Sequence, residues 1–125
     1  MKILFIANSF GEDTTRYLHG IARADGKNWK VANLYIGGCS LYRHYRNMLS
    51  GERAYSLEFN GQSTGFYVSL DEALLSRSWD VITIQQASPS SAKKRTYQPY
   101  LHELAVHIRK YCPQAKLYLH ETWAY

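Results

Sequence analysis

Residues 2–10 read KILFIANSF, an apolar stretch that stops abruptly at Asn8 and is followed by Ser9. A short, near-continuous apolar run is typical of a strand that is buried on both faces of a parallel sheet. A serine just past such a strand can cap the next helix, contact a phosphate group or act as a nucleophile. The rest of the sequence bears on which of these roles belongs to Ser9.

Three further segments repeat the strand pattern, and amphipathic segments separate them. Strands are expected at 2–7, 29–36, 80–86 and 116–123, and helices at 13–24, 40–49, 69–77 and 96–111. Ser69 and Glu72 have the spacing of a capping box at the start of the third helix. The apolar residues expected on one face of the second helix are Leu41, Tyr45, Met48 and Leu49.

Strands that alternate with helices predict an α/β fold with a parallel sheet. We expect a single domain over residues 1–125, of the three-layer flavodoxin-like type with about four parallel strands. Segment 54–70 interrupts the alternation, because it has two strand-like runs on either side of Asn60-Gly61. Asn-Gly between such runs is a strong hairpin signal, so we predict a β-hairpin insertion packed against one edge of the sheet.

Composition limits the class of protein. With 46% hydrophobic and 20% charged residues, the chain is globular rather than disordered. The net charge is +5, but the basic residues are scattered apart from Lys93-Lys94-Arg95, so we expect no nucleic-acid partner. Cys39 and Cys112 are too few for a disulfide framework and are expected to be reduced and packed. No stretch approaches the ~20 apolar residues of a membrane span and no secretory signal is visible, so we expect a soluble, cytoplasmic chain without a membrane partner.

Polar or glycine residues follow every predicted strand. The carboxyl ends of parallel strands meet at one edge, where open α/β sheets bind their ligands. One depression is therefore expected to be lined by Asn8-Ser9, Gly37-Gly38, Gln85-Gln86 and His120-Glu121. A serine at a helix N-terminus, glycine N–H groups and a carboxamide are the parts of an oxyanion hole. The same residues also suit an ordinary N-cap, a chain turn and glutamines that bind loop backbone.

Four stretches resemble the SGNH (GDSL-type) hydrolase superfamily, and in particular a bacterial branch whose first motif reads GNS. They are FIANSF (5–10), NLYIGGCSL (33–41), WDVITIQQAS (79–88) and the whole segment 97–125, so the resemblance covers nearly the entire chain. It implies that Ser9 is the nucleophile. It also implies that Gly38, or alternatively Gly37, donates an oxyanion-binding N–H.

Two motifs depart from the family pattern. Ala7-Asn8-Ser9 replaces Gly-Asp-Ser, and the asparagine of the third motif is missing. Gln86, or failing that Gln85, would supply the amide, since glutamine presents the same donor on a longer stem. Asn8, Gly37, Gln85 and His120 are then expected around the substrate.

The resemblance implies hydrolysis of a carboxylic ester, with an acetyl or acyl group on a carbohydrate as the expected substrate and with no metal or organic cofactor. The family takes its base from a DxxH motif near the C-terminus, and this chain contains no DxxH. We therefore expect a domain cut before its base. A catalytically incomplete fragment and a flavodoxin-like module that binds a small ligand are the alternatives. Losing the last strand would expose a sheet edge, which predicts a homodimer.

The histidines and tyrosines have competing interpretations. His120 is expected nearest to Ser9, whereas packing roles on the surface or at partly buried positions are expected for His19, His44, His102 and His107. In HELAVH (102–107) the two histidines are five positions apart and face directions about 140° apart, so we expect no zinc site. Core-edge packing or stacking on a substrate is expected for Tyr42, Tyr45, Tyr97 and Tyr100. Arg43 and the run 93–95 would attract an acidic substrate.

Overall fold

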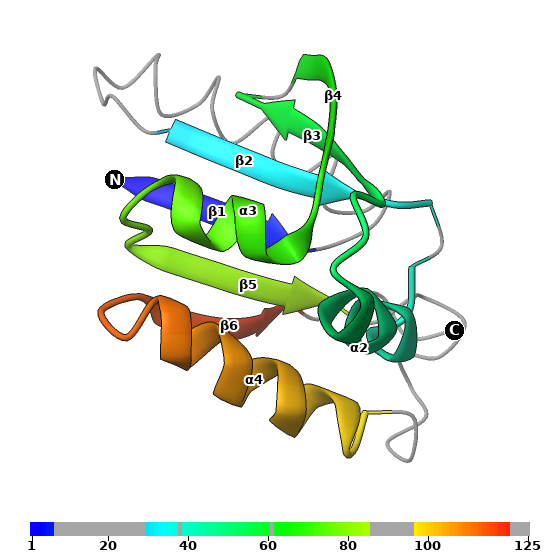
Figure 1. Ribbon diagram of the computed structural model, residues 1–125. Helices are drawn as coiled ribbons and strands as arrows, with labels where there is room; N and C mark the ends of the chain where they lie inside the picture. The colour runs from blue at the N-terminus through cyan, green and yellow to red at the C-terminus, as the bar shows by residue number, and fades with distance from the viewer. Residues whose placement is uncertain (7–29, 38, 61, 86–96, 121–125) are drawn as a thin grey trace.

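The computed structural model describes residues 1–6, 30–37, 39–60, 62–85 and 97–120 (Figure 1). These ranges form one six-stranded sheet in the order β4-β3-β2-β1-β5-β6. The strands are β1 (Lys2–Ile6), β2 (Lys30–Tyr35), β3 (Tyr55–Phe59), β4 (Gln62–Val68), β5 (Val81–Gln85) and β6 (Lys116–His120). The helices are α2 (Leu41–Ser50), α3 (Leu70–Ser76) and α4 (Tyr100–Tyr111).

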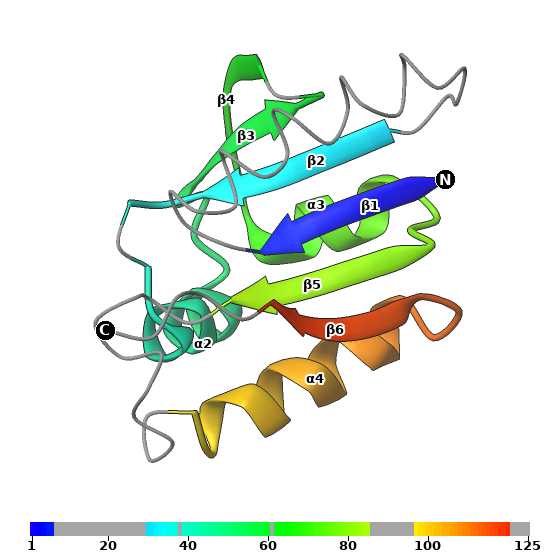
Figure 2. The same cartoon turned by 180° about the vertical axis from the view of Figure 1, so that it is seen from behind.

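The centre of the sheet is parallel. β1 pairs with β2 on one side and with β5 on the other, and β5 pairs with β6. The resulting order β2-β1-β5-β6 is that of a flavodoxin-like sheet, so the predicted fold class is confirmed. Ile6 lies opposite Leu34 and Ile84. The carboxyl ends of the parallel strands therefore share one edge, which Figure 2 shows from behind.

The predicted hairpin is present, and it extends the sheet. β3 pairs antiparallel with β2, and β4 pairs antiparallel with β3. Asn60 in the turn has a positive φ of 52°, a conformation that asparagine tolerates better than most residues. Its Oδ1 accepts a hydrogen bond from the Val31 N–H at 3.0 Å, and its own N–H donates to the Val31 carbonyl at 2.7 Å. These two bonds tie the turn to β2.

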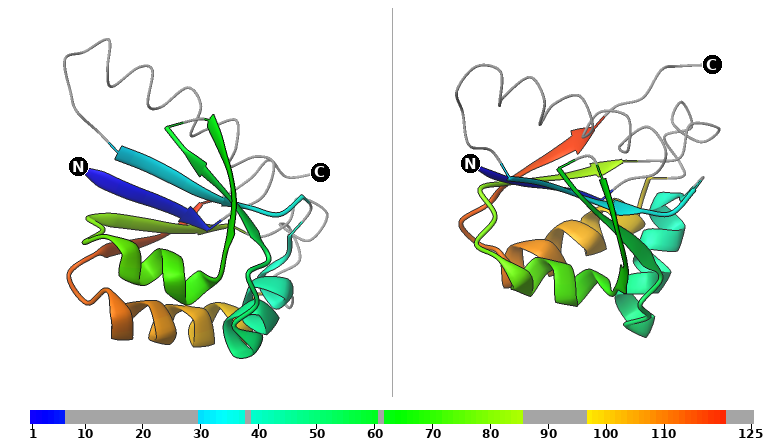
Figure 3. Two further views of the ribbon diagram at one scale, coloured as in Figure 1. Left: turned by 45° about the horizontal axis from the view of Figure 1, so that its top comes forward. Right: turned by 90° about the horizontal axis from the view of Figure 1, so that it is seen from above.

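The strands bury side chains on both faces, as their period of two requires. Helices α2, α3 and α4 all lie on one face, which Figure 3 shows from two directions. That face holds the larger core, which includes Leu4, Leu34, Trp79 and Ile82. The opposite face carries Ile3, Phe5 and Val31. The helix predicted over 13–24 lies outside the described residues.

The helices of the described ranges match the predicted segments with two differences. α4 begins at Tyr100, four residues later than expected. α2 buries Leu41, His44 and Asn47, whereas Leu49 on the predicted apolar face is 66% exposed. Cys39 and Cys112 are buried and form no disulfide with each other, as predicted. None of these helices is long and apolar enough to cross a membrane.

Candidate active site

The edge formed by the carboxyl ends of β1, β2, β5 and β6 is where the sequence predicts the site. Gln85 and His120 are the last residues of neighbouring strands and lie opposite each other in register. Gly37 follows the end of β2 by two residues. The structure therefore brings the backbone positions of Gly37, Gln85 and His120 to one edge. Four predicted site residues lie outside the described residues, and they are Asn8, Ser9, Gly38 and Gln86.

Gly37 sits in a turn that links β2 to α2. The Cys39 N–H donates to the Ile36 carbonyl at 3.2 Å, which closes the turn over residues 36–39. Gly37 is exposed, and a Cβ added to it would lie 3.3 Å from the hydroxyl of Tyr35. A side chain at this position would press on Tyr35. Glycine therefore leaves the surface of the turn open.

A buried polar cluster lies immediately behind this turn. It consists of Cys39, His44 and Tyr55, and we call it the His44 cluster. His44 has no exposed surface, and its Nδ1 lies 2.9 Å from the Tyr55 hydroxyl and 3.5 Å from the Cys39 sulfur. The His44 and Tyr55 rings stack with their centroids 5.6 Å apart. The cluster thus connects the turn, helix α2 and strand β3.

The electrostatics of the His44 cluster keep its members neutral. Burial lowers the pKa of His44 to about 3, and the nearby positive charge of Arg43 adds to the effect. Burial also raises the pKa of the Cys39 thiol to about 12, although Arg43 acts in the opposite direction. At neutral pH the pair is therefore a thiol and a neutral imidazole, and not the thiolate with imidazolium of a reactive cysteine. The cluster braces the turn and does not supply a nucleophile.

The burial of His44 corrects the sequence analysis, which predicted a surface or partly buried position. Burying an imidazole requires a hydrogen-bonding partner, and Tyr55 supplies it from strand β3. The other two histidines of the described helices match their predicted packing roles. His102 is exposed, and the Nε2 of the partly buried His107 lies 2.6 Å from Asp71 Oδ1. His19 lies outside the described residues.

A second buried polar pair lies on the sheet face opposite the helices, and the sequence analysis did not anticipate it. Asn33 on β2 donates through Nδ2 to Glu58 Oε1 at 2.8 Å, and the two residues are direct partners across β2 and β3. Both side chains are buried. Glu58 lies in the predicted hairpin, where the alternation of polar and apolar residues was the signal that could have placed it on this face. Within the described ranges, no group of three potential metal ligands gathers in one place.

The tyrosines expected at the core edge gather between α2 and α4. The ring of Tyr100 lies 5.0 Å from that of Tyr42 and 5.4 Å from that of Tyr45, centroid to centroid. Tyr97 and Tyr100 pack against the main core. These contacts support the packing interpretation. Tyr42 is 47% exposed and borders a hollow beside the helix.

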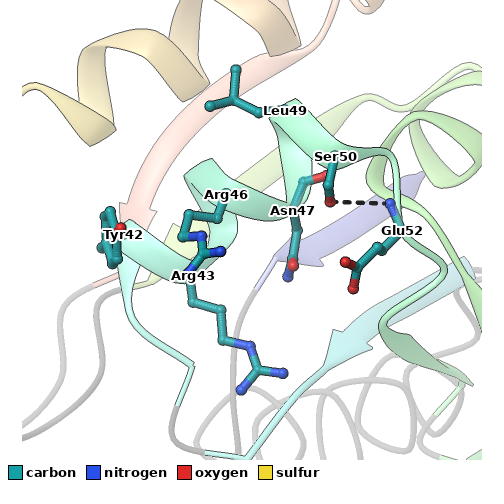
Figure 4. Close-up of a pocket in the computed structure, with 7 residues that line it drawn as sticks. All are labelled: Tyr42, Arg43, Arg46, Asn47, Leu49, Ser50 and Glu52. Carbon is teal, nitrogen blue, oxygen red and sulfur yellow. Dashed lines mark hydrogen bonds between the residues drawn. The ribbon is translucent and has the colours of Figure 1, made fainter.

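That hollow has a volume of about 600 Å³ and is drawn in Figure 4. Helix α2 lies at the end of the sheet toward which the parallel strands point, as Figures 1 and 2 agree. The hollow is therefore on the same side of the molecule as the predicted site. The described residues that line it are Tyr42, Arg43, Arg46, Asn47, Leu49, Ser50 and Glu52.

Comparison with known proteins places the chain in a family. A family model described as "Domain of unknown function (DUF4886)" matches residues 2–125. The chain belongs to the DUF4886 family. No curated protein matches it.

Two solved structures are similar to this DUF4886 chain. The crystal structure of a DUF4886 family protein from Bacteroides uniformis ATCC 8492 has 37% sequence identity and a TM-score of 0.92, over 100% of this chain and 51% of that one. A protein from Slackia heliotrinireducens, described as "a putative SGNH hydrolase", has 22% identity and a TM-score of 0.58, over 98% of this chain and 56% of that one. The second likeness is one of fold. The chain spans about half the length of both proteins.

Proposed function

We propose that this DUF4886 chain carries the nucleophile and the oxyanion-binding groups of a serine esterase of the SGNH type, within one SGNH hydrolase-like domain. The observation that carries the proposal is the shared edge of the four parallel strands, since each of these strands leads into a predicted site residue. Open α/β sheets place their ligands at this edge. The fold likeness to the protein described as "a putative SGNH hydrolase" supports it.

The proposed reaction is hydrolysis of a carboxylic ester, with an acetyl or acyl group on a carbohydrate as the substrate. The Ser9 hydroxyl attacks the carbonyl carbon and gives its proton to a histidine. The N–H groups of Ser9 and Gly38 and the Gln86 amide bind the oxyanion. Collapse of this intermediate expels the alcohol, which takes the proton from the imidazolium. Water then attacks the acyl-serine by the same route and releases the acid.

The His44 cluster gives this proposal a structural support. Donors in an oxyanion hole accelerate the reaction only if they are fixed before charge develops. The turn over residues 36–39 ends at Cys39 and is followed by the N-cap Ser40, whose side chain accepts from the Arg43 N–H at 3.2 Å. Since His44 contacts both Cys39 and Tyr55, the end of this turn at Cys39 is anchored to helix α2 and strand β3.

The proton acceptor is not one of the histidines in the described helices. His44 is buried, His107 contacts Asp71, and His102 lies exposed on α4. His120 ends β6 beside Gln85, at the same edge as Gly37. We place His120 among the substrate contacts, together with Asn8, Gly37 and Gln85.

Labelling with a fluorophosphonate tests the proposal. The chain, its Ser9→Ala variant and a control Ser78→Ala variant would be treated with the probe, and the intact mass of each would be measured. Ser78 is exposed and precedes β5, at the opposite end of that strand from the predicted site. We expect one label on the wild-type and Ser78→Ala chains and none on Ser9→Ala.

Other outcomes favour the alternatives. A label that persists in the Ser9→Ala variant would place the nucleophile elsewhere and overturn the proposal. An unlabelled wild-type chain would identify it as a catalytically incomplete fragment. Thermal stabilisation by nucleotides, with none by ester analogues, would instead indicate a flavodoxin-like binding module.

A further inference from the structure

The charged residues of helix α2 are placed unfavourably with respect to the helix dipole. Its first turn contains Arg43 and no acidic residue, and its last turn contains no basic residue. The N-terminal end of a helix has partial positive charge, so a cation there is unfavourable. Arg46 lies three positions further on, where two like charges repel each other. Helix stability therefore does not explain this pair of arginines.

Neither arginine is neutralised by the protein within the described ranges. The ion pairs there join Arg53 to Glu72 and His107 to Asp71. Both α2 arginines are exposed, and the guanidinium of Arg46 lies 5.9 Å from the centre of the Tyr42 ring. Arg43 and Arg46 thus present two positive charges from one helix, and no carboxylate of the described residues is bound to either.

The two arginines line the hollow of about 600 Å³ beside α2. Figure 4 shows Arg43 and Asn47 leaving the same side of the helix, with Glu52 nearby. Glu52 is the acidic residue of the described lining, so the two arginines outweigh it by one positive charge. The surface of this hollow therefore favours an anion.

Asn47 supplies an independent observation. It is only 6% exposed, although it lines the hollow, and its side chain is near enough to Tyr55 to oppose the rise in pKa that burial causes in that hydroxyl, but its Nδ2 has no partner at ordinary hydrogen-bond geometry in the described part of the chain. A buried amide donor without a partner is unfavourable and is rare in folded proteins. A ligand oxygen in the hollow would be a suitable acceptor for it.

We infer that this hollow is a subsite for an oxyanion on the substrate, namely a carboxylate, sulfate or phosphate group, which Arg43, Arg46 and Asn47 bind. This inference rests on the proposed esterase function, because helix α2, which lines the hollow, follows the turn that would carry the oxyanion-binding N–H. Guanidinium groups match planar and tetrahedral oxyanions through paired hydrogen bonds. The substrate class is then an ester of an acidic saccharide, rather than of a neutral one.

A binding experiment on the Ser9→Ala chain tests the subsite without requiring catalysis. Calorimetric titrations with glucuronate, inorganic sulfate and inorganic phosphate identify which oxyanion the hollow prefers. Arg43→Gln and Arg46→Gln are each expected to weaken binding of that anion about tenfold, the effect of losing one charged hydrogen bond. Arg109→Gln is the matched control, because it removes an exposed arginine from the last turn of α4. Equal weakening in all three variants, or no binding by the parent chain, would refute the subsite.

A kinetic experiment separates this inference from the proposed function. The chain with Ser9 intact would be assayed on acetylated glucuronate and acetylated glucose. We expect a preference for the anionic ester that Arg46→Gln abolishes and that the control Arg109→Gln retains. Hydrolysis without any preference would overturn the subsite but leave the esterase standing. If anion binding depends on Arg43 and Arg46 but the chain hydrolyses neither ester, the esterase proposal is overturned and the subsite stands.

Discussion

Helices α2 and α3 pack on the same face of the same sheet, but they differ in the charge of their first turn and in the polarity of the residues that they bury. α3 has a complete capping box between Ser69 and Glu72, acidic residues in its first turn, and a buried face of Leu70, Ala73 and Leu74. α2 has an arginine where α3 has acids, and it buries His44 and Asn47 beside Leu41.

The difference separates residues that serve the fold from residues that the fold does not explain. The capping box and the acidic first turn of α3 stabilise the helix, and the residues that it buries are apolar. α2 departs from this pattern at Arg43, His44 and Asn47, and His44 contacts Cys39 at the end of the turn that contains Gly37. Departures from local consistency tend to occur at functional sites. The comparison therefore supports placing the site at the N-terminal end of α2.

Acid is expected to have the largest effect on stability, and it acts on α2 through His44. The unfolded chain protonates His44 with a pKa near 6.5, whereas burial and Arg43 lower the folded pKa to about 3. The unfolded state thus binds more protons between these values, so the free energy of unfolding falls as the pH drops from about 6.5 toward 3. The full difference is on the order of 5 kcal/mol. Urea unfolding at a series of pH values measures it.

A His44→Gln variant is the control for the acid experiment, because glutamine has no proton to gain in this range. The variant is expected to be less stable than the parent at pH 7, and to lose less stability on acidification. Parallel pH profiles for the two chains would contradict a buried, neutral His44.

Removing the Tyr55 hydroxyl should have the next largest effect. Tyr55 is fully buried, and its hydroxyl lies 2.9 Å from His44 Nδ1. Tyr55→Phe leaves a buried imidazole nitrogen without this partner, and we expect a loss of about 1–3 kcal/mol in urea unfolding. Tyr118→Phe is the control, since Tyr118 is 54% exposed and should tolerate the change. An equal effect of both substitutions would mean that the hydroxyl of Tyr55 contributes nothing specific.

Removing the N-cap serine of each helix is expected to have a smaller effect on stability. Ser69→Ala removes the cap of α3, and Ser40→Ala removes the cap of α2. Each is expected to lower the free energy of unfolding by about 1 kcal/mol. Only Ser40→Ala should also slow fluorophosphonate labelling of Ser9, because Ser40 adjoins the turn over residues 36–39. A slower reaction in the Ser69→Ala chain would show that labelling merely follows stability.

Reversing the charge at the start of α2 should have the smallest effect on stability, and its sign is favourable. Arg43→Glu puts an acid into the first turn, as in α3, and is expected to stabilise the chain by about 0.3–1 kcal/mol. The same change should abolish anion binding in the hollow. Thermal unfolding and titration with inorganic phosphate measure the two effects. A destabilised variant would mean that Arg43 has a structural partner after all.

Sequence reasoning succeeded where the determinants are local. The parallel strands, the capping box of α3 and the turn at Asn60 each follow from a few neighbouring residues. On α2 it was right about Leu41 and Met48 but wrong about Leu49, because ranking residues by hydrophobicity favours Leu49 over His44. Tyr55, which makes the burial of His44 favourable, lies eleven positions away on another element.

The sequence predicted the location of the candidate site in the fold, but not the polar groups near it. The alternation of strands and helices locates the edge at which Gly37, Gln85 and His120 meet. The contact between Asn33 and Glu58 depends on how β2 pairs with β3, and the sequence spacing does not reveal that pairing. The proposed roles of Asn47 and Arg46 likewise depend on the hollow that they line, which the sequence does not show.

The central position of β1 has a consequence for the order in which the chain folds. β1 is made first, yet its partner β5 follows much later, as the contact between Lys2 and Asp80, 78 positions apart, illustrates. The β3–β4 hairpin closes over a two-residue turn and can form within about 1–10 μs. During synthesis the hairpin can therefore form well before β5 is available to pair with β1 at the centre of the sheet. Pairings that are distant in sequence are slow, so docking of β5 onto β1 is expected to limit the rate at which the native sheet is completed.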